Sequence, residues 1–362
     1  MNKIFKYKSR WFLCLLSLMI FIGCTNQSTQ TKELAVSKTP LTETETYLDT
    51  VVQLKIYHDG QEKVMEEAFD LVRHFDDIWS PNGTKSEVKQ INQAAGDHPV
   101  KVSKDTIDVL LDGQPYEEKS QGYFDLTVDP IVRLWQIGTD QARVPEESEI
   151  KAALPLIDYQ QIEIKPDEQT VYLPQKGMGV QIGSIAKGYI ADRLKELFES
   201  KGITTAIINL GGNVVVMGQS PSREDGWNVG VQDPDETRGE VVGSVIIKDS
   251  SIVTSGIYER FFEQDGKMYH HILNPKTGYP VDNDISGVSV FTKESVDGDA
   301  LSTTLFALGV KDGLALIESL DEVEAVFVLK DHRVITSSGL EGRFQLTNDQ
   351  YKMETINAYR GN

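Results

Sequence analysis

The spacing of apolar residues in the first half of the chain predicts one strand and three helices. Residues 51–57 alternate between apolar and polar positions like a strand, which ends at the turn His58-Asp59-Gly60. Further along, apolar residues recur with a helical period at Met65, Ala68, Phe69, Val72, Phe75 and Trp79. Two more helices are expected at 86–94 and 104–120, and a weakly patterned segment follows.

The second half has a clearer pattern, in which strands and helices intersperse. Residues 180–182 are strand-like and lead through a glycine-bracketed turn into an amphipathic helix that closes at Lys201-Gly202. Apolar runs predict strands at 206–210, 214–217, 227–231, 243–247, 258–263, 268–273 and 324–329, and helices at 299–308 and 311–320. Several of the strands form hairpins, so we expect an α+β fold with mixed or antiparallel sheets rather than a doubly wound parallel sheet.

The N-terminus has the pattern of an export signal. Basic residues precede the apolar run 11–22, which is too short to favour a membrane-spanning helix. The run ends at Gly23-Cys24 and resembles a bacterial lipobox, although a retained signal anchor with a chance cysteine is the alternative. We therefore expect a signal peptide at 1–23, a disordered tether at 24–46 from lipidated Cys24, a folded domain at 47–350 and a tail at 351–362. The domain would be held at the extracytoplasmic face of the cell membrane.

Charge and cysteine content exclude several kinds of function. The chain has 36 Lys and Arg against 55 Asp and Glu, a formal net charge of −19. Nucleic acid and anionic lipid should be repelled, so neither is expected as a general partner. Cys14 and Cys24 both fall in the signal region, which leaves the folded part without a disulfide framework or a thiol nucleophile.

Two short segments suggest metal-assisted chemistry on a nucleotide. The segment 181–189 carries Lys187 into the start of a helix, where unpaired N–H groups and a lysine suit a phosphate. Asp299 and Thr303 are four residues apart, so a carboxylate and a hydroxyl share one helix face and could hold a hard cation. The alternatives are that Lys187 is a solvated helix lysine, that Asp299 caps a helix and that Thr303 only packs.

Five motifs in register resemble the ApbE family. They are Gly183-Ser184-Ile185-Ala186-Lys187-Gly188-Tyr189, Asn209-Leu210-Gly211-Gly212-Asn213, Thr254-Ser255-Gly256, His271-Ile272-Leu273-Asn274-Pro275-Lys276-Thr277-Gly278 and Asp299-Ala300-Leu301-Ser302-Thr303. The resemblance covers roughly residues 47–344. It implies a T-fold-like α+β scaffold and the activity of an FAD:protein FMN transferase. Such an enzyme requires Mg²⁺, splits the pyrophosphate of FAD, transfers FMN to a threonine hydroxyl of a target protein and releases AMP.

The resemblance also implies roles for individual residues. The metal would be held by Asp299, Thr303 and the backbone carbonyl of Ser184. FAD would be contacted by Gln181, Lys187, Ser255, Ile272 and the segment Tyr123-Phe124-Asp125, although the aromatic rings of that segment could equally belong to the core. Gln181 and Asn274 stand where aspartates are usual in the family.

His271 is the candidate general base, because its neutral imidazole could take a proton from the attacking threonine. The alternative is that it positions substrate or satisfies a buried turn. Its neighbour His270 should point to the opposite face.

Two other functions fit the N-terminal features equally well. A solute-binding lipoprotein would deliver a small molecule to a membrane importer and would not need Asp299. A flavin carrier would hold FAD for electron transfer without cleaving it. The target proteins expected for the transferase are extracytoplasmic electron-transfer proteins.

Overall fold

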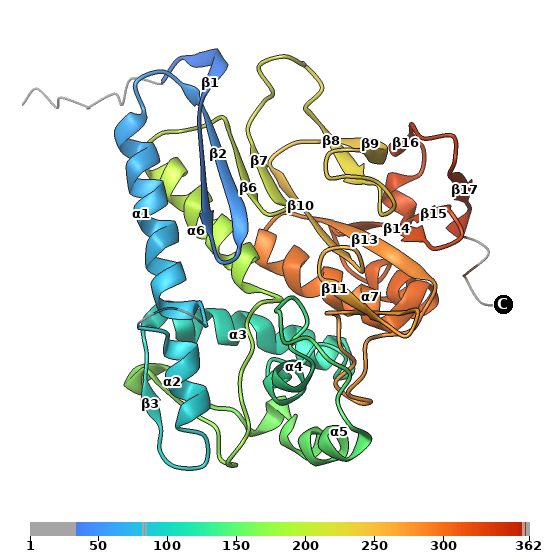
Figure 1. Cartoon of the computed structure of the whole chain (residues 1–362). Helices are drawn as coiled ribbons and strands as arrows, with labels where there is room; N and C mark the ends of the chain where they lie inside the picture. Colours follow the sequence, from blue (N-terminus) through green and yellow to red (C-terminus); the bar gives the residue numbers. More distant parts are fainter. Residues whose placement is uncertain (1–33, 82, 84, 357–358, 360–362) are drawn as a thin grey trace, which may run out of the picture. The chain divides into compact units, whose positions relative to one another are not determined.

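The structure is a computed structural model, and it describes residues 34–81, 83, 85–356 and 359. The helices are α1 (Glu62–Trp79), α2 (Glu87–Gln93), α3 (Lys104–Lys119), α4 (Asp129–Trp135), α5 (Glu147–Ala153), α6 (Ala186–Ser200) and α7 (Ser295–Ile317). In the described part of the chain, nine strands form the main sheet, in the order β1 (Val36–Tyr47), β2 (Thr50–His58), β6 (Ala206–Leu210), β7 (Asn213–Met217), β10 (Ser250–Gly256), β13 (Ile285–Thr292), β14 (Glu324–Leu329), β15 (Arg333–Thr336) and β17 (Lys352–Glu354). Neighbouring strands of this sheet are antiparallel except β15 and β17 (Figure 1).

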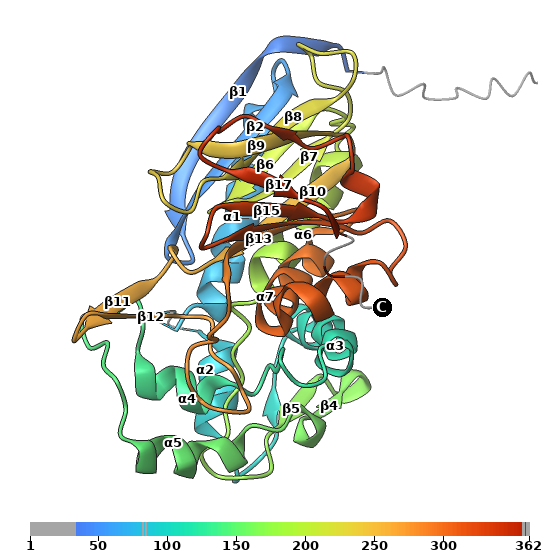
Figure 2. The ribbon, with the colours of Figure 1, turned by 90° about the vertical axis from the view of Figure 1, so that its right-hand side faces the viewer.

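Three small sheets surround the main one. They are the hairpin β11 (Phe261–Gln264) with β12 (Lys267–His270); β8 (Trp227–Gln232), β9 (Val241–Ile247) and β16 (Gln345–Leu346); and β3 (Val100–Lys101), β4 (Glu163–Lys165) and β5 (Thr170–Tyr172). The hairpin β11–β12 projects from the rest of the domain in Figure 2. The α+β prediction with mixed and antiparallel sheets is confirmed.

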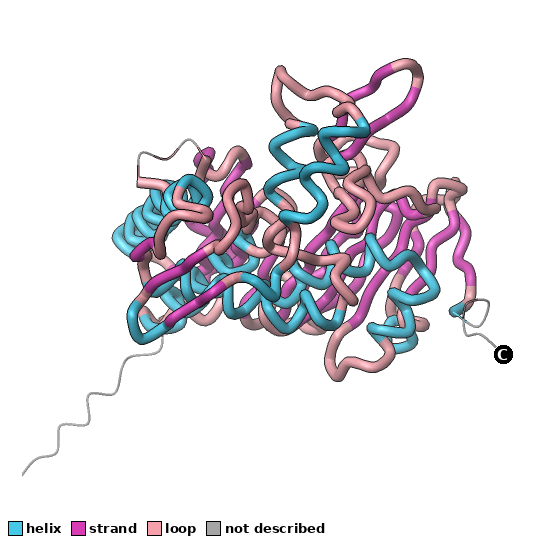
Figure 3. The backbone as a smooth tube through the Cα atoms, turned by 90° about the horizontal axis from the view of Figure 1, so that it is seen from below, coloured by secondary structure: helices cyan, strands magenta, loops and turns pink. Residues whose placement is uncertain are grey.

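The two faces of the main sheet are covered differently, and the alternation along β14 shows how. Ala325, Phe327 and Leu329 point into the larger core. Helices α1, α6 and α7 contribute to this core and lie along one side of the strands in Figure 3. Val326 and Val328 point the other way, into a second core that contains residues of β8 and β9. The helical side is the one that carries the predicted site motifs.

Most of the elements expected from periodicity are present. The apolar positions that predicted α1 are buried, as are the runs that predicted β6 and β7. The two helices expected at 299–308 and 311–320 occur as α7, which begins at Ser295 and is interrupted at Gly309 by a φ of 80°. Among the described residues, α7 alone is long and apolar enough to span a membrane, and here it packs against β10 and β13.

Three sequence predictions are wrong. Residues 36–46 belong to β1, an edge strand paired with β2, and not to a disordered tether. Strand β1 was missed because its side chains are mostly polar and exposed, as is common at the edge of a sheet. Residues 352–354 form β17 and not a tail, and residues 180–182 are not a strand. The weakly patterned segment, for which no element was predicted, contains α4 and α5. The predicted signal and Cys24 lie outside the described residues.

Candidate active site

The start of α6 and the first turns of α7 meet at one point of the helical layer. The carboxylate of Asp299 on α7 accepts a hydrogen bond from the backbone N–H of Gly188 on α6, at 2.8 Å. The Nζ atom of Lys187 lies 4.0 Å from the other carboxylate oxygen. A Cβ atom on Gly188 would lie 2.4 Å from the carbonyl oxygen of Ser295, so glycine is required for this close approach. The structure thus brings together the two segments that the sequence singled out.

Asp299 is a buried charge with little compensation from the protein. Its side chain is almost fully enclosed, and burial raises the pKa of its carboxyl group. The charge of Lys187 and the N–H of Gly188 act in the opposite direction but do not cancel the effect of burial. A cation next to the carboxylate would remove much of this electrostatic cost.

Two neutral oxygens in the segments that meet at Asp299, the hydroxyl of Thr303 and the carbonyl of Ser184, have unused hydrogen-bonding capacity. The hydroxyls of Ser302 and Thr304 bond back to carbonyls of α7, whereas the hydroxyl of Thr303 has no hydrogen-bond partner among the described residues. In a regular helix the N–H of Gly188 would bond the carbonyl of Ser184. Here it bonds Asp299 instead, and within the described part of the chain the Ser184 carbonyl accepts no backbone hydrogen bond.

These three oxygen groups fit a hard cation. One carboxylate, one hydroxyl and one carbonyl suit Mg²⁺, which usually keeps several waters and takes few protein ligands beside a substrate phosphate. In the residues that the structure describes, no three side chains of His, Cys, Asp or Glu gather into a metal site. A cation here would therefore depend on Asp299 as its carboxylate ligand.

His271 follows β12 and is set up as a neutral base. Its Nδ1 atom lies 3.2 Å from the carbonyl of Arg260, so Nδ1 carries the proton and Nε2 keeps a free lone pair. Burial lowers the pKa of His271 to about 4 against the opposing effect of that hydrogen bond, and the charges of Arg260 and Lys187 lower it further. The imidazole is neutral at physiological pH and can accept a proton.

The neighbouring His270 has a structural role. Its Nε2 donates to the carbonyl of Val281 at 2.9 Å, its Nδ1 accepts from the N–H of Ile272, and its ring packs edge-on against Phe306. His270 is buried whereas His271 is partly exposed, so the two neighbouring histidines have different surroundings.

Gln181, Ser255 and Ile272 support the site from its surroundings. The side-chain oxygen of Gln181 accepts from the N–H of Gly183 and so shapes the glycine turn. Ser255 bonds the hydroxyl of Ser302 at 2.9 Å, which ties the end of β10 to the first turns of α7. Ile272 is buried in the larger core.

Of the segment 123–125, which was predicted to contact the flavin, only part can reach a ligand. Phe124 is 2% exposed and belongs to the core, so its ring cannot form a wall of a ligand site in this structure. Asp125 accepts hydrogen bonds from the backbone and hydroxyl of Thr127 and stabilises its own turn. Tyr123 remains partly exposed, and Nζ of Lys276 lies 3.9 Å from the centre of its ring. Lys276 belongs to the motif at 271–278, but the sequence carries no signal that it contacts Tyr123, which is far away along the chain.

The turn after His271 is shaped by Asn274 and Gly278. Asn274 accepts backbone hydrogen bonds through both its side chain and its carbonyl. Gly278 has a φ of 77°, and a Cβ there would lie 2.4 Å from Ile150. Asn274 therefore has a turn-forming role in this structure.

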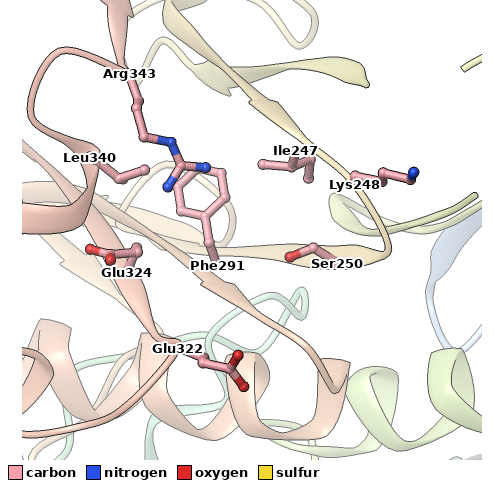
Figure 4. Close-up of a pocket in the computed structure, with 8 residues that line it drawn as sticks. All are labelled: Ile247, Lys248, Ser250, Phe291, Glu322, Glu324, Leu340 and Arg343. Carbon is pink, nitrogen blue, oxygen red and sulfur yellow. The ribbon is translucent and has the colours of Figure 1, made fainter. Parts of the chain in front are cut away.

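A depression of about 200 Å³ elsewhere on the molecule contains none of the predicted site residues (Figure 4). It is lined by Ile247, Lys248, Ser250, Phe291, Glu322, Glu324, Leu340 and Arg343. Glu324 is already bonded to the hydroxyl of Ser337. The depression is therefore separate from the α6–α7 contact.

Comparison with known proteins places this chain in a defined family. The sequence model of the ApbE family matches residues 48–327. The FAD:protein FMN transferase of Klebsiella pneumoniae (strain 342) is 38% identical over 303 residues, which are 83% of this chain and 93% of that protein. The FAD:protein FMN transferase of Treponema pallidum (strain Nichols) is 36% identical over 302 residues, covering 80% and 83% of the two chains.

Solved structures agree with the fold. The crystal structure of the ApbE protein from Thermotoga maritima has a TM-score of 0.76 and 27% identity, and the match covers 84% of this chain and 99% of that one. The apo form of the Pseudomonas stutzeri flavinyl transferase ApbE has a TM-score of 0.74, with 85% and 98% covered. At 24% identity, the second likeness shows the fold alone. From its sequence and its fold, the chain belongs to the ApbE family.

Proposed function

We propose that this protein is an FAD:protein FMN transferase, which moves FMN from FAD to a threonine hydroxyl of an extracytoplasmic electron-transfer protein and releases AMP. The observation that carries the proposal is the meeting of the α6 N-terminus, Lys187 and the buried Asp299. A helix N-terminus with a lysine attracts phosphate oxygens, and an enclosed carboxylate attracts a cation. Relatives that carry this name and match most of the chain support it.

Each residue then has a defined task. Asp299, Thr303 and the Ser184 carbonyl would hold Mg²⁺, which when bound neutralises charge on the pyrophosphate oxygens. Lys187 attracts the phosphates and orients them. Nε2 of His271 accepts the proton of the threonine hydroxyl as its oxygen attacks the phosphorus of the FMN phosphate. The bond from that phosphorus to the bridging oxygen breaks, and AMP leaves with the electron pair.

A membrane anchor at Cys24 forms a second part of the proposal. The folded domain begins with β1 at Val36, so residues 25–35 would link it to the lipid. Fully extended, such a link spans at most roughly 40 Å, which keeps the domain close to the membrane surface. Cell fractionation tests this part: Cys24→Ala should move the protein from the membrane to the soluble fraction, and retention in the membrane would favour a signal anchor.

The transferase activity is tested by incubating the full-length protein with FAD, Mg²⁺ and an extracytoplasmic electron-transfer protein from the same cell. Mass spectrometry should show a gain of one FMN on a threonine, and chromatography should show AMP. Asp299→Ala should abolish both signals. FAD turnover that does not change in this variant would favour the solute-binding alternative, whereas binding of FAD without any AMP would favour a flavin carrier.

A further inference from the structure

The N-termini of α6 and α7 are capped by each other. Neither helix receives a side-chain hydrogen bond from the residue that precedes it. Asp299 of α7 accepts from the N–H of Gly188 in the first turn of α6, at 2.8 Å. Asp192 of α6 accepts from the N–H groups of Ser295 and Val296 in the first turn of α7, at 2.8 Å each. Each helix thus supplies the cap that the other lacks.

The spacing of these residues makes the arrangement reciprocal. Gly188 and Asp192 are four residues apart on α6, and Ser295 and Asp299 are four residues apart on α7. Residues with this spacing lie on the same helix face, one turn apart. The hydrogen bonds at Asp192 and Asp299 therefore join the same two faces at neighbouring turns, and together they fix both the separation and the rotation of α7 relative to α6.

We propose that Asp192 is a positioning residue for the candidate metal ligand Asp299. The inference rests on the proposed function of the site, because it assigns to Asp192 the task of holding the carboxylate of Asp299 beside the α6 N-terminus. Without the bonds from Asp192, the carboxylate of Asp299 is held at α6 by its bond to the N–H of Gly188 and its longer ion pair with Lys187, and the first turn of α7 can move away from α6. Residues that orient a metal ligand in this way commonly contribute about tenfold to a hundredfold in metal affinity.

The first turns of α7 have other attachments, so the loss of Asp192 need not unfold the domain. The hydroxyl of Ser295 donates to the side chain of Asn213 at 2.6 Å, and Tyr116 donates to Asp297 at 2.5 Å. These bonds hold α7 to β7 and α3, but they do not join it to α6. The bonds of Asp192 fix the distance between α6 and α7. We therefore expect the loss of Asp192 to weaken metal binding while the domain stays folded.

The experiment measures binding of Mn²⁺, a paramagnetic substitute for Mg²⁺, to the full-length protein by electron paramagnetic resonance in the absence of FAD. Asp192→Asn should raise the dissociation constant for Mn²⁺ about tenfold or more, because the amide presents one acceptor where the carboxylate presents two. The same shift should appear in the Mg²⁺ concentration needed for FAD cleavage, with the rate largely recovered at saturating Mg²⁺.

Asp233→Asn is the matched control. Asp233 is equally buried and accepts hydrogen bonds from Tyr351, Asn348 and the N–H of Asp235, but it lies in the second core region away from α6 and α7. This variant should lose stability without any change in Mn²⁺ affinity. A purely structural role for Asp192 predicts that the two variants behave alike.

The outcomes separate the two proposals. Loss of Mn²⁺ binding in Asp299→Ala with unchanged binding in Asp192→Asn would overturn the positioning role and leave the metal site standing. A wild-type protein that binds no Mn²⁺ would refute the metal site and this inference together. Circular dichroism checks folding; if Asp192→Asn is unfolded, Asp192→Glu takes its place under the same criterion, and unfolding of both would assign Asp192 to stability alone.

Discussion

Replacing Gly188 by alanine sets two opposite effects against each other. Alanine in a helix is more favourable than glycine by about 1 kcal/mol, which by itself would stabilise α6. The added Cβ, however, would lie 2.4 Å from the carbonyl oxygen of Ser295 and 2.6 Å from Cα of Val296. Both obstacles are backbone atoms, so no side-chain rotation can relieve the overlap. Overpacking of this kind costs about 1–3 kcal/mol, and we expect a net loss of stability.

The same displacement acts on the site. Ordinary contacts of a Cβ begin at 3.4 Å, so α6 and α7 must separate by about 1 Å to accommodate the new methyl group. The 2.8 Å hydrogen bond between Gly188 and Asp299 would then exceed hydrogen-bonding distance. A misplacement of about 1 Å in an active site can cost about a hundredfold in rate, and this is the expected loss in FAD cleavage.

The assay compares wild type, Gly188→Ala and Gly313→Ala for release of AMP from FAD at saturating Mg²⁺ and for urea-induced unfolding. Gly313 is also a helical glycine, in α7, but a Cβ there would meet its nearest atom, Cζ of Phe327, at 3.3 Å. Gly313→Ala should keep full activity and gain up to about 1 kcal/mol of stability. A Gly188→Ala variant that is as active as wild type and more stable would show that the helices are not in contact at this point.

Three further predictions concern protonation and the metal. Burial raises the pKa of Glu117 from 4.5 to about 8, so the contribution of Glu117 to stability should be fully present below pH 4.5 and be lost as the pH rises towards 8. The stability advantage of Glu117→Gln should therefore grow by about 3 kcal/mol between pH 4.5 and pH 7, and a constant difference in urea unfolding would contradict the raised pKa. Because the pKa of His271 is lowered to about 4, the acidic limb of kcat/KM for transfer should lie near pH 4, whereas a limb at the ordinary value of 6.5 would argue against His271 as the base. Thr303→Ala should raise the Mg²⁺ requirement about tenfold with an unchanged circular dichroism spectrum, and collapse of the spectrum would make Thr303 structural.

Local patterns predicted the elements whose apolar faces are buried. Helix α1 follows directly from its apolar period, and β6 and β7 follow from their apolar runs, because α1 packs into the larger core and the two strands contribute to both cores. Strand β1 has no such signal: it is mostly exposed and is held by backbone pairing to β2. Strand β13 was also missed, since Ser286, Gly287 and Ser289 break its apolar run although the strand is buried throughout. Strands β1 and β13 form because of their pairing with neighbouring strands and, for β13, because of packing on both faces. Neither can be predicted from the residues of one segment.

Some residues of the candidate site could likewise be predicted from the sequence, and others could not. The spacing of Lys187, Asp299 and Thr303 was readable from the sequence, because each role depends on a short local motif. Phe124 was ambiguous because an aromatic residue in a loop can face a ligand or the core, and only its packing decides. Asp192 could not be found at all, since its partner Ser295 is 103 residues away and a single acid on an amphipathic helix normally faces solvent.

An acidic protein that acts on an anionic substrate needs a local reversal of its charge. The chain has a net charge of −19, so a dinucleotide approaching it is repelled over most of the surface. At the α6–α7 contact, the partial positive charge of a helix N-terminus and the ammonium of Lys187 are concentrated around one enclosed carboxylate. Had several carboxylates gathered there, they would hold a cation more tightly but would also repel the pyrophosphate. A single carboxylate with neutral oxygen ligands would leave a bound cation with net positive charge, which the substrate phosphates could then share.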